Sequence, residues 1–256
     1  MQGAIAAGHP LTAEAGGRVL AGGGNAVDAC IAAAFVGAVA EGPLTGPAGG
    51  GFLLVTEPDE EAVVLDCFFS SPARPLGEMD EVLVDFADSG TQAFHIGEGS
   101  VAVPGLVAGL EEAHRRYASR DWHELVQPAI ELAGRGVEVD APRAFLHGIL
   151  REILLHTDDG ARVFGDPGRV ATEELVPTLE GIRDRRAAAV SELLPELADD
   201  LAAYRVIERR PCVGDVAGFR FLTVPSPSIG GGIALEILAG LASLEPWSLD
   251  AEAAVV

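Results

Sequence analysis

The most regular pattern in the chain is a run of small and apolar residues from Ala26 to Ala40, interrupted only by Asp28. Asn25 stands directly before this run, where its side-chain oxygen can accept hydrogen bonds from the first free amides of a helix, and Asp28 suits the N-terminal end of the helix dipole. A helix without a polar face packs between layers. The run is also shorter than the ~20 apolar residues of a membrane span. We therefore predict a buried central helix here.

Other helices show ordinary start and stop signals. Within the segment Leu11 to Ala21, Glu14 and Arg18 are four residues apart, which predicts an ion pair on a partly exposed helix face. Further helices are predicted over residues 104–117, 121–133, 140–156 and 230–241. The stretch 157–195 is polar and arginine-rich, and it predicts only a loop at Gly165–Gly168 followed by more helix.

Short apolar runs predict the strands. The runs 52–55 and 62–65 flank an acidic turn that contains Pro58, which predicts a β-hairpin. Other strands are predicted near residues 82–84, 100–103, 204–207 and 219–224. The length allows one large domain or two small ones, and since no linker divides the chain we predict a single α+β domain over residues 1–256.

Composition excludes several classes of function. With 17 basic and 39 acidic residues the net charge is -22, which argues against binding to nucleic acids or anionic membranes. All the basic residues are arginine, so a lysine Schiff base, a Ser-Lys dyad and a Walker-type phosphate loop are excluded. The widely spaced Cys30, Cys67 and Cys212 are predicted to be reduced and buried. No secretory signal is visible, so we expect a cytoplasmic protein unless a leader was removed.

No familiar catalytic motif is present in the sequence. None of the six histidines has zinc-peptidase spacing, no G-x-S-x-G motif occurs, and Ser70 and Ser71 have no base nearby in the sequence. The glycine-rich turns fit neither nucleotide-binding fingerprint. We therefore expect no metal, no cofactor and no catalytic nucleophile in this chain.

An ordered set of short motifs is similar to the large-subunit portion of the γ-glutamyltransferase (γ-glutamyltranspeptidase) family. The motifs are collinear over most of the chain: Ala7–Thr12, Gly23–Ala29, Gly46–Phe52, Ala102–Gly105, Pro128–Ala133, Asp200–Tyr204 and Pro225–Gly231. Any one of them could arise by chance, whereas so many in the right order indicate membership.

This resemblance implies an N-terminal-nucleophile hydrolase with a four-layer αββα sandwich, completed by a small subunit that is not in this chain. The precursor would cleave itself and expose a threonine, whose own α-amino group, with a pKa of about 8, takes the hydroxyl proton. The implied partners are this Thr-initiated small subunit and a small-molecule γ-glutamyl or related amide substrate. A truncated fragment without the nucleophile is the alternative.

One motif departs from the family pattern. The family's Asp-Phe-Arg-Glu element corresponds to Asp66–Phe69, and Phe68 occupies the position of the arginine that grips the substrate α-carboxylate. A phenyl ring cannot replace a bidentate guanidinium. The candidate substrate-binding residues are therefore Phe68, Phe69 and the nearby Arg74, with core packing as the other interpretation of the two rings. An acylase for apolar or dicarboxylic side chains, similar to cephalosporin acylases, and a non-catalytic binding protein are the alternative functions.

Overall fold

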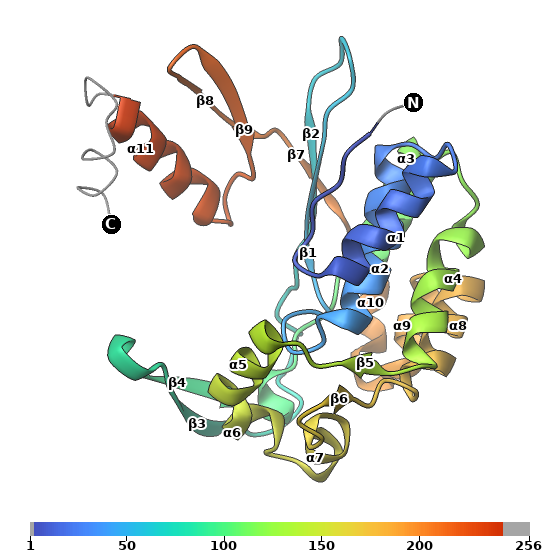
Figure 1. Cartoon of the computed structure of the whole chain (residues 1–256), viewed down its shortest axis with the longest axis vertical. Coiled ribbons are helices and arrows are strands. Elements are labelled where there is room, and N and C mark those ends of the chain that lie inside the picture. The colour runs from blue at the N-terminus through green and yellow to red at the C-terminus, as the bar shows by residue number, and fades with distance from the viewer. Residues whose placement is uncertain (1–2, 243–256) are drawn as a thin grey trace. The chain divides into compact units, whose positions relative to one another are not determined.

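The computed structural model describes residues 3–242, and their contacts form two compact units (Figure 1). The first unit contains residues 3–51 and 67–205, and the second contains residues 52–66 and 206–242. The single domain expected over residues 1–256 stays a prediction.

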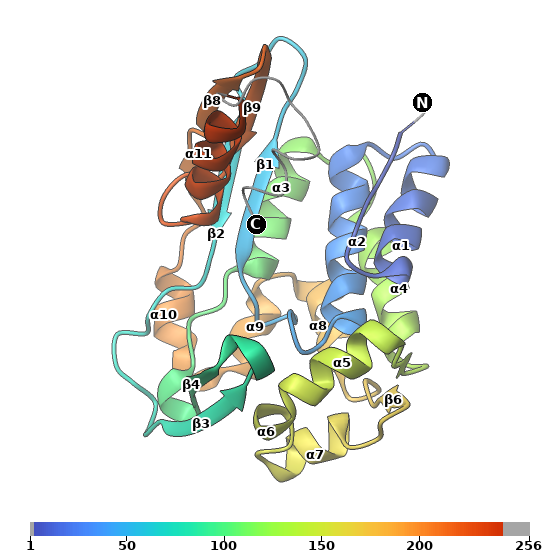
Figure 2. The ribbon, with the colours of Figure 1, turned by 60° about the vertical axis from the view of Figure 1, so that its left-hand side comes forward.

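The first unit is built around α2 (Ala26–Ala40), which confirms the predicted central helix. α1 (Pro10–Ala21), α3 (Leu106–Tyr117) and α4 (Trp122–Ala133) pack against it, as Figure 2 shows. Eleven of the 15 residues of α2 are buried. Since the helix is apolar on every side, burial against three neighbours is what stabilises it.

The start of α2 forms the capping box that the sequence predicts. The Asn25 side chain accepts from the Asp28 amide at 2.9 Å, and the Asp28 carboxylate accepts from the Asn25 amide at 2.8 Å. Gly23 has a φ of 86°, so the turn that leads into the helix favours glycine. The ion pair predicted on α1 is also present, with 2.5 Å between Arg18 and Glu14.

A further helix, α8 (Leu175–Arg185), packs against α4, and the buried Trp122 donates to the Ile182 carbonyl at 3.1 Å. α9 (Ala188–Leu193) packs on α8, and α10 (Ala198–Ala203) packs on α9. The remaining helices of this unit are α5 (Ala141–Ile149), α6 (Arg151–Leu154) and α7 (Asp158–Phe164). The single helix predicted over 140–156 is therefore wrong, because the chain breaks at Leu150, close to the poor helix former Gly148.

The strands of the first unit form small ribbons. β3 (Asp80–Asp85) pairs antiparallel with β4 (Thr91–Ile96), and β5 (Val137–Glu138) pairs with β6 (Arg169–Val170). The strand predicted at 100–103 is wrong: residues Glu98–Ser100 form a 3-10 turn, and only Val103 makes a β-bridge, to Ser70. β4 escapes prediction because most of it is exposed and it lacks an apolar alternation. Two further 3-10 turns cover Ala87–Ser89 and Pro195–Leu197.

The second unit combines a sheet and a hairpin. β1 (Gly51–Val55), β2 (Val63–Cys67) and β7 (Ile207–Arg209) form a sheet in the order β1-β2-β7, which confirms the pairing of the runs 52–55 and 62–65. β8 (Cys212–Val216) and β9 (Phe219–Thr223) form an antiparallel hairpin, and α11 (Gly230–Ala242) packs on it. β7 lies three residues later than predicted, and β8 was not predicted.

No disulfide joins Cys30, Cys67 or Cys212, and only Cys67 is buried. The prediction of three buried thiols is wrong for Cys30, which is exposed on the first turns of α2, and for Cys212, which is half-buried. Between residues 3 and 242, no helix has both the length and the apolar character that a membrane crossing requires. The cytoplasmic location stays a prediction.

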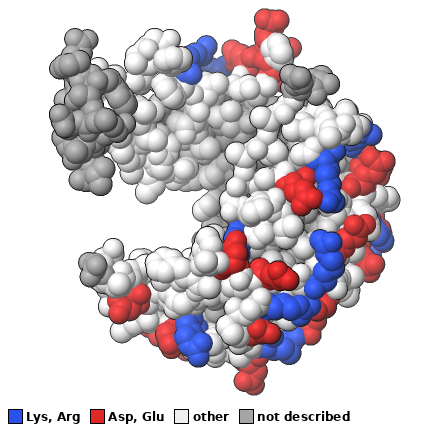
Figure 3. Space-filling model, in the orientation of Figure 1, with Lys and Arg blue, Asp and Glu red and all other residues white. Residues whose placement is uncertain are grey.

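Acidic and basic side chains are intermixed on the face of the molecule drawn in Figure 3. Several arginines are paired locally; for example, Glu112 accepts from both Arg115 and Arg116 on α3. These bonds, the one from Arg115 foremost, lower the pKa of Glu112 to about 2 despite partial burial. The strongly negative composition therefore coexists with arginines held in local ion pairs.

Candidate functional site

The three predicted substrate-binding residues lie on one stretch of chain that begins at the last residue of β2, here called the Cys67–Arg74 segment. Phe68 and Phe69 are 41% and 43% exposed, and their ring centroids lie 4.1 Å apart at 45°. Two adjacent aromatic rings that remain this exposed form an apolar surface patch rather than core. The structure thus brings Phe68 and Phe69 together and leaves both accessible.

Side chains and backbone from distant parts of the chain anchor this segment. The Tyr204 hydroxyl donates to the Phe68 carbonyl at 2.7 Å, and the Asp200 carboxylate accepts from the Ala73 amide at 3.0 Å. Ser70 exchanges two backbone hydrogen bonds with Val103, of 3.2 and 2.8 Å. Because these partners bind main-chain atoms, they fix the backbone of the segment, while the two phenyl rings keep their exposed surface.

Glycines allow the chain to pass close to the same segment. A Cβ atom on Gly50 would lie 2.8 Å from the Phe69 nitrogen and 3.0 Å from the Cys67 carbonyl oxygen. A Cβ atom on Gly105 would overlap both the Tyr204 hydroxyl and the Cys67 carbonyl. Gly49 then ties the two passes together, since its carbonyl accepts from the amides of Gly105 and Leu106 at 3.0 and 2.9 Å.

Three of the sequence motifs therefore converge on one place. Gly46–Phe52, Ala102–Gly105 and Asp200–Tyr204 are far apart in the sequence, yet each supplies a residue that contacts or closely approaches the Cys67–Arg74 segment. No individual role for these residues follows from the sequence alone. Their signal was only their place within the family-like motifs, because hydrogen bonds to a distant backbone leave no local pattern.

Charged side chains in and beside the Cys67–Arg74 segment differ in whether they form ion pairs. Asp66, the one acidic residue of β2, is buried and accepts from Arg209 on β7 at 2.7 Å, and both residues belong to the second unit. Arg74 is exposed and forms no ion pair with any residue between 3 and 242. Its guanidinium is thus available to an anionic ligand, whereas that of Arg209 is engaged.

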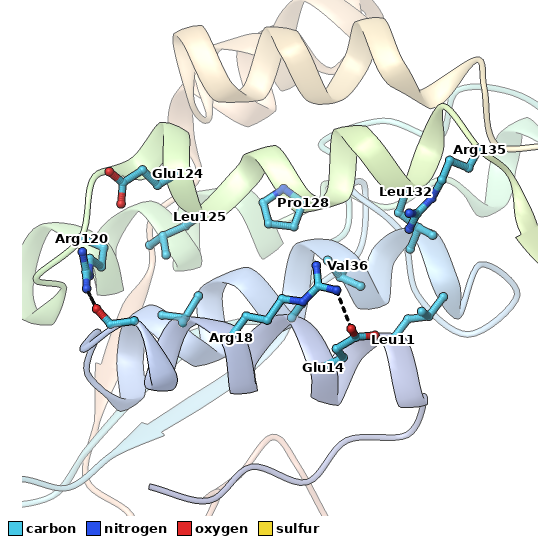
Figure 4. Close-up of a pocket in the computed structure, with 13 residues that line it drawn as sticks. Leu11, Glu14, Arg18, Val36, Arg120, Glu124, Leu125, Pro128, Leu132 and Arg135 are labelled. Carbon is cyan, nitrogen blue, oxygen red and sulfur yellow. Dashed lines mark hydrogen bonds and ion pairs between the residues drawn. The ribbon is translucent and has the colours of Figure 1, made fainter. Parts of the chain in front are cut away.

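Two hollows of the first unit lie outside the aromatic pair. A cavity of about 130 Å³ is lined by Tyr204, Pro104 and apolar residues of α3 and α9. A groove of about 290 Å³ runs between α1 and α4 (Figure 4). Neither is lined by Phe68, Phe69 or Arg74, and all three of these residues are exposed.

No group of three or more His, Cys, Asp or Glu side chains within residues 3–242 is arranged to hold a metal ion. His9 instead caps α1, where its Nδ1 accepts from the Leu11 amide at 2.9 Å. Burial lowers the pKa of His9, and the nearby Arg143 lowers it further against the opposing effect of Asp140 and Glu41, which favours the neutral ring that this cap requires.

The structure defines the class of fold: it is the α+β fold of N-terminal-nucleophile hydrolases, because the chain superimposes on solved structures with that fold. Residues 12–178 match the family model described as Gamma-glutamyltranspeptidase. The chain belongs to the gamma-glutamyltranspeptidase family, as the collinear motifs indicate.

Among the relatives that this chain resembles, some are named glutathione hydrolases and others are named acylases. The chain is 30% identical to the Glutathione hydrolase proenzyme of Bacillus subtilis (strain 168) over 92% of its length and 44% of the relative's. It is also 30% identical to the Acylase ACY 1 proenzyme of Pseudomonas sp. (strain SE83) over 90% of its length and 46% of the relative's. Thus the chain spans less than half of these curated relatives.

A solved structure extends the likeness to the fold. The gamma-glutamyltranspeptidase of Helicobacter pylori matches with a TM-score of 0.79 and 28% identity, covering 95% of this chain and 75% of that one. The similarity therefore includes both units of the chain.

Proposed function

We propose that this chain acts as the large subunit of a self-processed amidohydrolase or acyltransferase of the γ-glutamyltransferase type. The observation that carries the proposal is family membership over residues 12–178. Both similar relatives bear names of proenzymes, and the chain spans 44% and 46% of them. We infer that a partner subunit supplies an N-terminal threonine as nucleophile and completes the αββα sandwich.

In this proposal the Cys67–Arg74 segment forms one wall of the acyl site. Its backbone is held by Tyr204, Asp200 and Val103, so the two rings are presented on a fixed support. Fixed supports favour catalysis because they hold the substrate in a productive geometry. Arg74 is the one guanidinium of the segment, and we assign to it the carboxylate of the acyl group.

A second candidate function follows from Phe68. An apolar ring at this position favours an acyl group that is apolar where γ-glutamyl carries its α-carboxylate, because a carboxylate placed against a phenyl ring loses water without gaining a partner. A relative named as an acylase is as similar to this chain as one named as a glutathione hydrolase. The two candidates share the nucleophile and differ only in the acyl group.

The processing step can be tested directly. The complete open reading frame is expressed, and the purified protein is analysed by denaturing mass spectrometry. We expect two polypeptides, the second beginning with threonine, and a single uncleaved precursor when that threonine is replaced by alanine. One chain of unchanged mass with no Thr-initiated species would contradict the proposal and support a non-catalytic binding protein that kept the fold.

A further inference from the structure

The groove between α1 and α4 has no part in the acyl site proposed above. Both helices pack on α2, and the groove between them is floored by buried apolar side chains, Val36 of α2 and Leu125 and Leu132 of α4. Its volume of about 290 Å³ lies near the lower end of the range for small-molecule sites, roughly 300–1,000 Å³. Figure 4 shows the ring of Pro128 on the same wall.

The two ends of this groove are cationic. Arg120 lies at one end and Arg135 at the other, and Figure 4 shows them flanking the apolar floor. Arg120 donates one hydrogen bond to the Gly22 carbonyl, which leaves most of its five N–H donors for other partners. Arg135 is exposed, and its guanidinium forms no ion pair within residues 3–242.

The acidic residues of the groove do not cancel these charges. Glu14 is paired with Arg18 at 2.5 Å, so the two neutralise each other beside the middle of the groove. Glu124 lines the groove at the end that holds Arg120 (Figure 4), but it forms no ion pair with Arg120 or with any other residue between 3 and 242. What remains is one guanidinium at each end of an apolar floor, in a chain whose net charge is -22.

We propose that this groove binds a linear dicarboxylate with an apolar middle, one carboxylate at Arg120 and the other at Arg135. The arginines flank a helix of 12 residues, about 18 Å of helix axis, and their side chains can turn inward, so the ligand is a medium-length chain. Guanidinium groups bind carboxylates through paired hydrogen bonds, and the apolar floor contributes by excluding water from the methylene chain. The proposal does not depend on the acyl site.

Binding is measured by isothermal titration calorimetry on the full-length protein with dodecanedioate, dodecanoate and dimethyl dodecanedioate as probes. We expect dodecanedioate to bind at least tenfold more tightly than dodecanoate, and the uncharged diester to bind most weakly. A series of shorter and longer dicarboxylates is expected to show an optimum length. Equal affinity for the dicarboxylate and the monocarboxylate would overturn the proposal.

Substitutions distinguish the contribution of the arginines at the two ends of the groove from that of its apolar side chains. Arg135→Gln is expected to weaken the binding of dodecanedioate at least tenfold, to the affinity of dodecanoate. Arg115→Gln, at an exposed position of α3 outside the groove, is the control and is expected to change the affinity for neither acid. Leu11→Ser, at the half-buried apolar rim, is expected to weaken both acids equally. Because Arg135 is exposed, its variant tests the proposal even where Arg120→Gln fails to fold. An equal loss of dodecanedioate affinity in Arg115→Gln would show only a general attraction of the dianion to positive charge, and it would refute the site.

Discussion

The carboxylate of Asp28 accepts a hydrogen bond of 2.6 Å from the hydroxyl of Ser119, 91 residues further along the chain. It also accepts from the amides of Ser119 and Arg120 at 2.9 and 3.0 Å, in addition to its bond within the cap of α2. Burial would raise the pKa of Asp28, but the bonds from Ser119, Asn25 and Arg120 outweigh it and hold the pKa below its ordinary value. One side chain thus caps the central helix and fixes the turn between α3 and α4.

Asp28→Asn is expected to destabilise the protein by about 3 kcal/mol, because an amide group then faces donors where a buried carboxylate accepted several charge-assisted hydrogen bonds. Chemical denaturation monitored by circular dichroism measures the change. Glu14→Gln removes an exposed ion pair on α1 and is the matched control, with an expected loss below about 1 kcal/mol. Equal losses in the two variants would contradict this role.

The hydrogen bonds of Asp28 differ in how far they can be predicted from the sequence. The cap of α2 is local, so Asn25 and Asp28 could be identified from their spacing alone. Ser119 could not, since a bond across 91 residues leaves no trace in the local pattern. The same holds for the candidate site: Phe68 and Phe69 lie in one family-like motif with Arg74 close behind it, whereas the bonds that Tyr204 and Asp200 make to this segment are visible only in the structure.

Errors in the predicted elements share a physical cause. The central helix and the buried β2 carry strong apolar patterns and were found, whereas β4 and β8 keep mostly exposed or half-buried residues and were missed. Strands of this kind are specified by their partner rather than by an apolar face. Sequence patterns therefore predict the centre of the first unit better than its ribbons.

Gly105→Ala is expected to destabilise the protein by about 2 kcal/mol or more, because the added methyl would overlap the Cys67 carbonyl and the Tyr204 hydroxyl. The backbone of Gly105 has φ of -118°, so the effect is one of space and not of conformation. Gly148→Ala on α5 is the control: a Cβ atom there meets nothing within 4 Å, and alanine favours the helix by up to about 1 kcal/mol. Thermal unfolding of both variants measures the difference, and a stable Gly105→Ala variant would show that the segment can move.

His147→Leu is expected to stabilise the protein by about 1 kcal/mol at neutral pH, because Nε2 of His147 is buried without a hydrogen-bond partner within residues 3–242. Burial lowers the pKa of this imidazole, and Arg143 lowers it further. The folded protein therefore favours the neutral ring. The contribution of His147 to the free energy of unfolding is fully present above the pKa of the unfolded chain, about 6.5. This contribution is lost as the pH falls from there through the lowered pKa of the folded protein.

Denaturation curves between pH 8 and pH 5 check the sign of this effect. Wild type is expected to lose stability on acidification, and His147→Leu is expected to lose less. His123→Leu is the control, because His123 is exposed at the start of α4 and lies in solvent in both states. A wild-type curve that rises on acidification, or an equal change in both variants, would contradict the assignment to His147.

Phe68→Arg is expected to change which acyl group the assembled enzyme prefers. With phenylalanine in place, kcat/KM for an aliphatic anilide such as pentanoyl-p-nitroanilide is expected to exceed that for γ-glutamyl-p-nitroanilide, since the ring offers apolar contact and no partner for a carboxylate. The arginine variant is expected to reverse this order by at least tenfold, because a guanidinium binds the carboxylate through paired hydrogen bonds. Glutaryl-p-nitroanilide, which keeps the carboxylate and lacks the amine, is expected to follow the γ-glutamyl substrate.

Phe145→Arg is the matched control for this experiment, because it makes the same chemical change at an exposed phenylalanine of α5, outside the Cys67–Arg74 segment. It is expected to leave the ratio of the two kcat/KM values unchanged. Arg74→Gln completes the set: if Arg74 receives the carboxylate in the wild type, this variant loses activity on γ-glutamyl and glutaryl substrates and keeps it on the aliphatic one. A wild-type preference for γ-glutamyl that survives Arg74→Gln would place the carboxylate site elsewhere and remove both residues from substrate binding.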